Sequence, residues 1–299
     1  MAARKMKLSR GYKVFLTFDY ILMFFIAFVT ILPFVYVISI SLLSQEGLMK
    51  YGFTLIPREF SLVNYKYIIT RNISTFANGY KNTIFITVVG TAMNLLVTAG
   101  VAYPLSKKNL PARNLITMFL FFTMLFGGGL VPLYLVVKGT GLMDTRWALI
   151  IPELVNVWNM LILRNFFMTI PDSIEESAQI DGCSPMGILF RIILPLSLPS
   201  IMTIGLFYAV YHWNNWFSAT IYISDAGKKP MMQILRDILL LSKLGEEDSS
   251  VGNTIQSITV PSVGIENASI VIAILPILAV YPYIQKYFVK GVLVGSVKG

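Results

Sequence analysis

Residues 173–199 read SIEESAQIDGCSPMGILFRIILPLSLP and form an acidic, polar island in a chain that is otherwise apolar and basic. Four acids lie just before its start or within its first nine residues, although the whole chain holds only 15 Asp and Glu in 299 positions; they are Asp172, Glu175, Glu176 and Asp181. Such a cluster is where a protein embedded in a membrane would offer a contact to a soluble partner.

The composition around this island is that of a membrane protein. Hydrophobic residues make up 56% of the chain, charged residues make up 13%, and the mean hydropathy is +0.70. One soluble core of this size cannot bury so much apolar surface. A helix needs about 20 mostly apolar residues to cross a bilayer. We therefore predict an all-α integral membrane protein with six transmembrane helices, at about residues 14–42, 83–105, 115–137, 147–167, 196–223 and 265–287.

Positive charge at the helix ends predicts the orientation of the chain. Cytoplasmic flanks retain Lys and Arg during insertion, and the first helix usually dominates. We expect both termini to be cytoplasmic, and the first apolar stretch is too long to be the core of a signal peptide. The basic residues concerned are Arg4, Lys5, Lys7, Arg10 and Lys13 at the N-terminus, Lys107, Lys108 and Arg113 in an inner loop, and Lys286, Lys290 and Lys298 at the C-terminus.

Few residues could support catalysis or bind a metal. The only cysteine, Cys183, excludes an internal disulfide, and the only histidine, His212, cannot form a metal cluster by itself. The run at 127–129 lacks the Lys-Ser/Thr of a phosphate-binding loop and is more typical of a packing or kinking point. The net charge of +9 comes from cations that flank apolar spans, which favours lipid headgroups over nucleic acid. We expect no catalytic residue, no metal and no cofactor on this chain.

Local signals divide the island into two short helices. The fourth span ends at Pro171, and Ser173 with Glu176 three residues later forms a capping box that starts a helix. Gly182 is placed to end that helix, and the Ser-Pro pair at 184–185 is typical of the start of a second one. The alternative is a solvated loop whose acids only cap a helix, and the residues alone leave both interpretations open.

The order of residues in the island resembles a family pattern. The segments ESA at 176–178, DG at 181–182 and IILP at 192–195 resemble the EAA motif of permease subunits in bacterial binding-protein-dependent ABC importers. In that family the pattern is Glu-Ala-Ala, a glycine four residues later, and then Ile-x-Leu-Pro. Ser177 replaces the first alanine, and this change keeps the side chain small.

The resemblance covers most of the chain and fits a subgroup of these permeases. The segments are IPREFSLVNY from Ile56, YPLS from Tyr103, FGGGLVPLYL from Phe126 and YPYIQKYFVKGVLVGSVKG from Tyr281. They are similar to carbohydrate-type permeases related to those for maltose and for oligosaccharides. Each segment alone is a weak signal, but their order along six spans is specific.

The resemblance implies a fold, a function and partners. The fold is that of type I ABC importer permeases, with an N-terminal part at 1–75, a permease domain at 76–288 that contains the EAA loop at about 172–195, and a cytoplasmic tail at 289–299. The function is ATP-driven uptake of a carbohydrate, an oligosaccharide, across the bacterial cytoplasmic membrane by alternating access. The partners are a second permease subunit, with a heterodimer expected over a homodimer, two cytoplasmic ATPase subunits that bind ATP and Mg²⁺, and an extracytoplasmic solute-binding protein.

The resemblance also implies which residues contact the ATPase. In the family, the EAA loop forms a coupling helix that docks into a cleft of the ATPase subunit. Carried over to this sequence, the docking surface comprises Glu175, Glu176, Ala178, Asp181 and Gly182, with Ile174 and Ile180 as apolar contacts.

Polar residues inside the spans are the candidates for a substrate pathway, because they are costly in lipid and face a cavity or another helix. Aromatic rings, amides and hydroxyls suit a sugar, which has apolar faces edged by hydroxyl groups. The alternatives are an interfacial aromatic belt and hydrogen bonds between helices. The candidates are Asn94, Tyr134, Asn156, Asn159, Tyr208, Tyr211, His212, Asn214 and Asn215.

Two other functions stay open at this point: an ion-coupled secondary transporter and a membrane scaffold that transports nothing. The first would use an acid deep in the membrane and a larger, repeated set of spans. We place one acid, Asp19, at membrane depth, close enough to the basic N-terminus to pair with Lys13. A scaffold would not co-purify with ATPase subunits.

Overall fold

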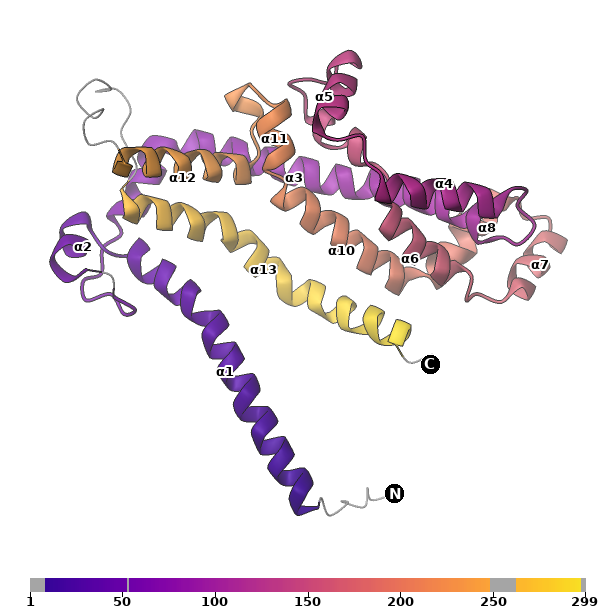
Figure 1. Cartoon of the computed structure of the whole chain (residues 1–299), viewed down its shortest axis with the longest axis horizontal. Coiled ribbons are helices and arrows are strands. Elements are labelled where there is room, and N and C mark those ends of the chain that lie inside the picture. The colour runs from indigo at the N-terminus through magenta and orange to yellow at the C-terminus, as the bar shows by residue number, and fades with distance from the viewer. Residues whose placement is uncertain (1–8, 53, 248–261, 297–299) are drawn as a thin grey trace. The chain divides into compact units, whose positions relative to one another are not determined.

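A computed structural model describes residues 9–52, 54–247 and 262–296, and every regular element in these ranges is helical (Figure 1). This confirms the predicted all-α class. The chain divides into two compact units, Met1–Asn72 with Ile238–Ile274, and Ile73–Asp237 with Leu275–Gly299. Four of the basic residues used to predict the orientation, Arg4, Lys5, Lys7 and Lys298, lie outside the described residues.

The first unit contains α1 (Arg10–Ser41), α2 (Gln45–Tyr51) and the first turns of two long helices, α3 (Val63–Ser106) and α13 (Val263–Ser296). Buried Asn64 joins α3 to the end of α1, because its Nδ2 donates to the carbonyl oxygens of Ser41 and Leu43 at 3.0 and 2.8 Å. A Cβ atom at Gly264 would lie 2.5 Å from the same Nδ2. The close approach of α13 to α3 therefore requires glycine at this position.

The second unit holds most of α3 and the elements that follow it. They are α4 (Arg113–Leu125), α5 (Leu130–Gly139), η1 (Arg146–Leu149), η2 (Ile151–Glu153), α6 (Val157–Phe167), α7 (Asp172–Ile180), α8 (Pro185–Ile188), the π-helical turn η3 (Leu189–Ile193), α9 (Leu194–Leu196), α10 (Leu198–Asn214), α11 (Phe217–Tyr222), η4 (Ala226–Lys228) and the start of α12 (Met231–Glu247). Apolar side chains almost inaccessible to solvent form its core where α3, α6 and η3 meet; they include Leu163, Phe167, Ile188 and Ile193.

Six membrane spans can be assembled from the described helices. Three are long and apolar enough without a partner: α1, α3 and the part of α13 up to Val280. Three bent pairs reach that length together, namely α4 with α5, η1–η2 with α6, and α8–α9 with α10, and their bends are 110°, 50° and 86°. With each pair counted as one span, the number agrees with the prediction. α3 begins 20 residues earlier than the predicted second span, so the preceding loop is shorter than expected.

The third span, predicted as one helix over 115–137, is broken. α4 ends at Leu125, and α5 starts only after Gly129, whose φ of +88° lies in the left-handed region that favours glycine. The chain turns by 110° between them, and Figure 1 shows α5 leaving the line of α4. Hydropathy cannot reveal such a break, because the residues on both sides of the glycines are equally apolar.

Polar side chains tie together the loops near η1 and η4. Asn82 on α3 donates from Nδ2 to two carbonyl oxygens of the segment 227–229, at 2.9 and 3.1 Å, and its Oδ1 accepts a hydrogen bond from Arg146 Nε at 2.8 Å. Asp144 Oδ1 accepts one from the backbone N–H of Asp225 at 2.9 Å, and this hydrogen bond lowers the pKa of Asp144. The carboxylate therefore stays charged at neutral pH and holds the loop that precedes η4.

Candidate functional site

The acidic island folds as two short helices, but the first one starts differently from the prediction. α7 begins at Asp172, with Pro171 as its N-cap residue and no side-chain hydrogen bond to the cap. The capping box predicted from Ser173 and Glu176 is therefore wrong. Ser173 already lies in the first turn, and its carbonyl oxygen accepts a hydrogen bond from Ser177 Oγ at 2.8 Å. Pro171, with a fixed φ and an extended ψ of 133°, supplies the non-helical residue from which the helix starts.

The predicted end of this helix at Gly182 is confirmed. Gly182 has a φ of +81°, its N–H donates to the carbonyl oxygen of Gln179 at 3.0 Å, and the N–H of Cys183 donates to that of Ala178 at 2.9 Å. These two hydrogen bonds define a Schellman motif, which needs a left-handed residue at this point. The direction in which the chain leaves α7 is thus fixed by one glycine.

The second helix of the island starts where it was predicted. Ser184 caps α8 by accepting a hydrogen bond from the N–H of Gly187 at 3.2 Å, and Pro185 occupies the first helical position. The sequence favours a helix that continues through Ile192, but α8 ends at Ile188 and residues 189–193 form the π-helical turn η3. A π turn leaves a local irregularity in the hydrogen-bond ladder.

The two sides of α7 have different surroundings. Glu175 and Ala178 are buried against the rest of the second unit. The other five residues predicted to contact an ATPase are exposed: Ile174, Glu176 and Ile180 on α7, and Asp181 and Gly182 directly after it. Ile180 is 87% exposed. The prediction placed all seven residues on one surface, and the helical period turns two of them inward.

Glu175 attaches α7 to the end of α3. Its Oε1 forms an ion pair with Lys107 Nζ, and its Oε2 accepts a hydrogen bond from Tyr103 Oη at 3.1 Å. The carboxylate side chain is only 8% exposed and that of Lys107 28%. A second pair, Lys108 with Asp172 at 3.4 Å, joins the same elements on the surface, where its side chains are 78% and 65% exposed.

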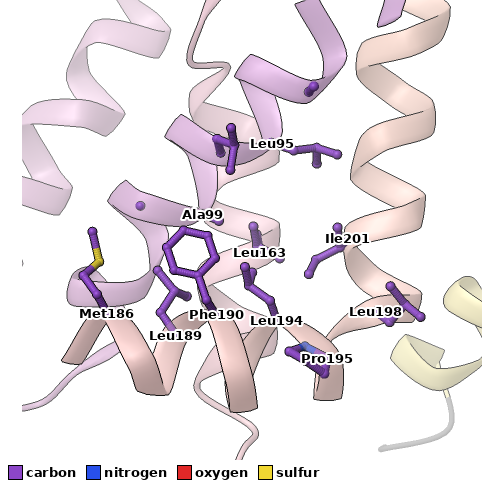
Figure 2. Close-up of a pocket in the computed structure, with 13 residues that line it drawn as sticks. Leu95, Ala99, Leu163, Met186, Leu189, Phe190, Leu194, Pro195, Leu198 and Ile201 are labelled. Atoms are coloured by element: carbon purple, nitrogen blue, oxygen red, sulfur yellow. The ribbon is translucent and has the colours of Figure 1, made fainter. Parts of the chain in front are cut away.

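An apolar cavity of about 630 Å³ lies beside this junction. Figure 2 shows side chains that line it from α3, α6, α8, η3, α9 and α10. The lining carries no charged or hydroxyl side chain; the labelled residues are Leu95, Ala99, Leu163, Met186, Leu189, Phe190, Leu194, Pro195, Leu198 and Ile201. Such a cavity offers nothing to the hydroxyl groups of a sugar.

A second cavity, of about 430 Å³, is polar and aromatic. It brings together four of the predicted pathway residues, Asn156, Asn159, Tyr208 and Tyr211, and its remaining lining residues are Glu153, Trp158 and Phe207. Sequence reasoning missed Glu153, although this acid stands within the predicted fourth span only three residues before Asn156. The prediction that Asp19 is the one acid at membrane depth is therefore wrong.

Hydrogen bonds between α3 and α10 hold this polar cavity in place. Asn94 Nδ2 donates to the carbonyl oxygens of Glu153 and Leu154, so its Oδ1 accepts from His212 Nε2 at 2.7 Å. One turn further along α3, Thr98 Oγ1 lies 2.7 Å from Tyr208 Oη. Asn94 and His212, both predicted for the pathway, are buried and position the wall of the cavity without lining it.

The remaining candidates lie elsewhere. Asn214 and Asn215 line a neighbouring hollow of about 400 Å³ together with Tyr211. Asn215 Oδ1 accepts a hydrogen bond from the N–H of Ser218 at 3.2 Å and so starts α11. Tyr134 stacks on Tyr222, with ring centroids 6.5 Å apart. In the described ranges no group of three or more His, Cys, Asp or Glu is placed to hold a metal ion.

The chain is similar to transport proteins along nearly its whole length. It is 45% identical over 288 residues to the polygalacturonan/rhamnogalacturonan transport system permease protein YtcP of Bacillus subtilis, which covers 95% of this chain and 97% of the relative. The fold is also similar to one chain in the crystal structure of a bacterial ABC transporter involved in the import of the acidic polysaccharide alginate. The TM-score is 0.83 and the sequence identity is 30%, and the match covers 95% of this chain and 100% of the other. The chain belongs to the ABC transporter permeases.

Other relatives of this permease have similar coverage. Protein LplC of Bacillus subtilis is 49% identical over 271 residues, which are 91% of this chain and 90% of the relative. The arabinooligosaccharides transport system permease protein AraQ of Halalkalibacterium halodurans is 27% identical over 92% of this chain and 94% of its own. No family model matches the sequence. The similarity to these relatives confirms the predicted permease family.

Proposed function

We propose that this permease carries a carbohydrate, an oligosaccharide, across the cytoplasmic membrane by alternating access in an ATP-driven importer. The observation that carries the proposal is the 45% identity to a permease named for polygalacturonan and rhamnogalacturonan. The similar solved transporter imports alginate, and AraQ is named for arabinooligosaccharides. These compounds are all chains of sugar units, although their charges and linkages differ.

The polar cavity has the chemistry that a sugar ring requires. Trp158 and Tyr211 offer aromatic faces to the apolar faces of the ring. The carboxylate of Glu153 accepts hydrogen bonds from hydroxyl groups, and the amides of Asn156 and Asn159 both donate and accept them. We assign this cavity to the substrate pathway.

Truncation of Trp158 tests this assignment. Because the indole is 61% exposed and lines the cavity, Trp158→Ala removes the stacking face without emptying the core. We expect the KM for uptake to rise about three- to tenfold with little change in maximal rate. The matched control is Trp147→Ala, which removes an indole that packs edge-on against Phe85 outside this cavity. If both variants have the same uptake kinetics as the native protein, the assignment of this cavity to the substrate pathway is wrong.

We further propose the partners and domains of the complex. The exposed side of α7, within an EAA loop at about 172–195, contacts one of two cytoplasmic ATPase subunits, which bind ATP and Mg²⁺. This chain then has no catalytic role and no cofactor of its own. A second, different permease subunit completes the pathway, and an extracytoplasmic solute-binding protein delivers the substrate. The permease domain comprises residues 76–288, between an N-terminal part at 1–75 and a tail at 289–299.

The proposed orientation places α7 and both termini in the cytoplasm, and the native Cys183 reports on it. This is the only cysteine in the sequence, and it is partly exposed next to α7. We expect a membrane-impermeant maleimide to label it in inverted membrane vesicles stripped of peripheral proteins. The same reagent should leave it unlabelled in right-side-out vesicles. The reverse pattern would invert the topology.

The function itself is tested by purifying the chain from its own membranes through a terminal tag. We expect two ATPase subunits, a second permease and a solute-binding protein to co-purify, and the reconstituted complex to hydrolyse ATP as it imports oligosaccharide. The presence of the acid Glu153 in the wall of the polar cavity favours an ion-coupled carrier instead. Uptake that stops when the proton and sodium gradients collapse, with ATP still present, would establish that alternative.

A further inference from the structure

Two physical routes connect α7 to the rest of the second unit. One runs along the chain through α8, η3 and α9 into α10. The other leaves the chain and passes from the buried side of α7 to the end of α3 through Glu175. The two routes differ in how continuous their helices are.

The route along the chain is interrupted at several points. α8 has four residues, a π-helical turn of five follows, and α9 has three. The chain then bends by 86° before α10. The apolar cavity in Figure 2 lies beside these same segments, so their packing against α3 is incomplete. Small rotations at each of these junctions can absorb a displacement of α7.

The route through Glu175 is direct. Both carboxylate oxygens are used, one by Lys107 and one by Tyr103, and the Lys107 ammonium also lies 4.7 Å from the centroid of the Tyr103 ring. That ring packs edge-on against Phe167 of α6 at 6.3 Å. The Glu175 carboxylate is buried, so moving it away from Lys107 and Tyr103 would leave a charge without partners in the interior, which is costly.

α3 runs from Tyr103 to the polar cavity as one helix, with Pro104 in its last turn. Tyr103 and Asn94 are nine positions apart in the sequence, which corresponds to about 14 Å along a helix. Over that distance two side chains of α3 form hydrogen bonds around the cavity. Thr98 bonds with Tyr208, and Asn94 bonds with His212 and with the carbonyl oxygen of Glu153. The same helix is therefore held by polar contacts at α7 and at the cavity.

We propose that Glu175 is a positioning residue that fixes α7 to α3, and that α3 transmits the movement of α7 to the polar cavity. This rests on the proposed function, because it assigns a route between the ATPase contact and the substrate pathway. It gives Glu175 a role inside the permease, different from the contact with the ATPase that the family resemblance implies for the exposed side of α7.

The test uses the complete complex, purified through this chain and reconstituted in liposomes. Glu175→Gln keeps the shape of the side chain and its hydrogen bond with Tyr103 but removes the charge. We expect uptake per ATP hydrolysed to fall roughly tenfold, with the ATPase subunits still bound and their basal hydrolysis unchanged. The exchange variant Lys107→Glu/Glu175→Lys restores the pair and should bring uptake per ATP back to within about threefold of the native value.

The surface pair provides the matched control. Asp172→Asn neutralises an exposed partner of Lys108 between the same two elements, and we expect uptake per ATP to stay at the native level because exposed pairs contribute little. The proposal is overturned if Glu175→Gln couples normally, if the exchange variant stays uncoupled, or if both variants lose their ATPase subunits. A native complex that hydrolyses no ATP would instead refute the proposed function, and with it the route that rests on that function.

Discussion

Replacing Gly182 with valine is expected to uncouple ATP hydrolysis from uptake. The residue has a φ of +81°, a conformation that costs an L-residue about 1–2 kcal/mol and a β-branched one more. The Schellman motif would relax, and α8 would leave α7 in a new direction, so that the exposed side of α7 would no longer be aligned for the proposed contact with the ATPase. We expect uptake per ATP to fall at least about tenfold, measured in reconstituted complexes.

Gly141→Val is the matched control for this substitution. Gly141 also has a positive φ, +72°, and open space around it, so the strain is of the same kind but lies in the loop after α5. The control should lower the unfolding temperature to a similar extent and keep uptake per ATP near the native value. Equal uptake per ATP in the two variants would mean that strain alone, and not the position of α7, sets the result.

The second large effect is expected at Gly90, where alanine should disrupt the polar cavity. A Cβ atom there would lie 2.6 Å from His212 Nε2 and 2.9 Å from two carbon atoms of the same ring. The ring is buried, so it can move only by breaking its hydrogen bond with Asn94, which also positions Glu153. We expect about 1–3 kcal/mol of destabilisation from overpacking and a fall in uptake of about tenfold or more.

Gly100→Ala serves as the control on the same helix. A Cβ at Gly100 meets nothing within 4 Å, so alanine should leave uptake unchanged and stabilise α3 by about 0.5–1 kcal/mol through its higher helix propensity. Thermal unfolding and uptake of both variants separate the two cases. Native uptake by Gly90→Ala would show that the His212 ring can move without harm to the cavity.

Hydropathy predicted the number of spans but not their shape. α1 and the apolar part of α13 lie close to their predicted ranges because an uninterrupted apolar run has only one way to satisfy its backbone in lipid. The break at 126–129 falls on the glycine run that was predicted to be a packing or kinking point. The break at Asn215 was not predicted, since a bend depends on φ and on packing, and these leave no trace in mean hydropathy. The early start of α3 was missed because residues 63–82 are polar enough to resemble a loop.

Residue type alone predicted part of the candidate site. Asn156, Asn159, Tyr208 and Tyr211 do line one cavity, because a polar side chain in a span needs a polar neighbour. The pattern could not separate lining residues from supporting ones such as His212, since both kinds need partners. Nor could it show that Glu175 faces inward, because Glu176 beside it has the same chemistry and only the rotation of α7 distinguishes them.

The break between α4 and α5 has a consequence for the synthesis of this subunit. The two helices are apolar enough to cross a membrane as a pair, yet residues 126–129 between them are non-helical and exposed in the chain. Hydrocarbon gives no hydrogen bonds to free backbone groups, so this segment must meet another protein or water. If the proposed second permease supplies this contact, a copy made without it exposes backbone groups to lipid, and membrane quality-control proteases can detect them. The amount of this permease in a cell should then follow the supply of the proposed second permease.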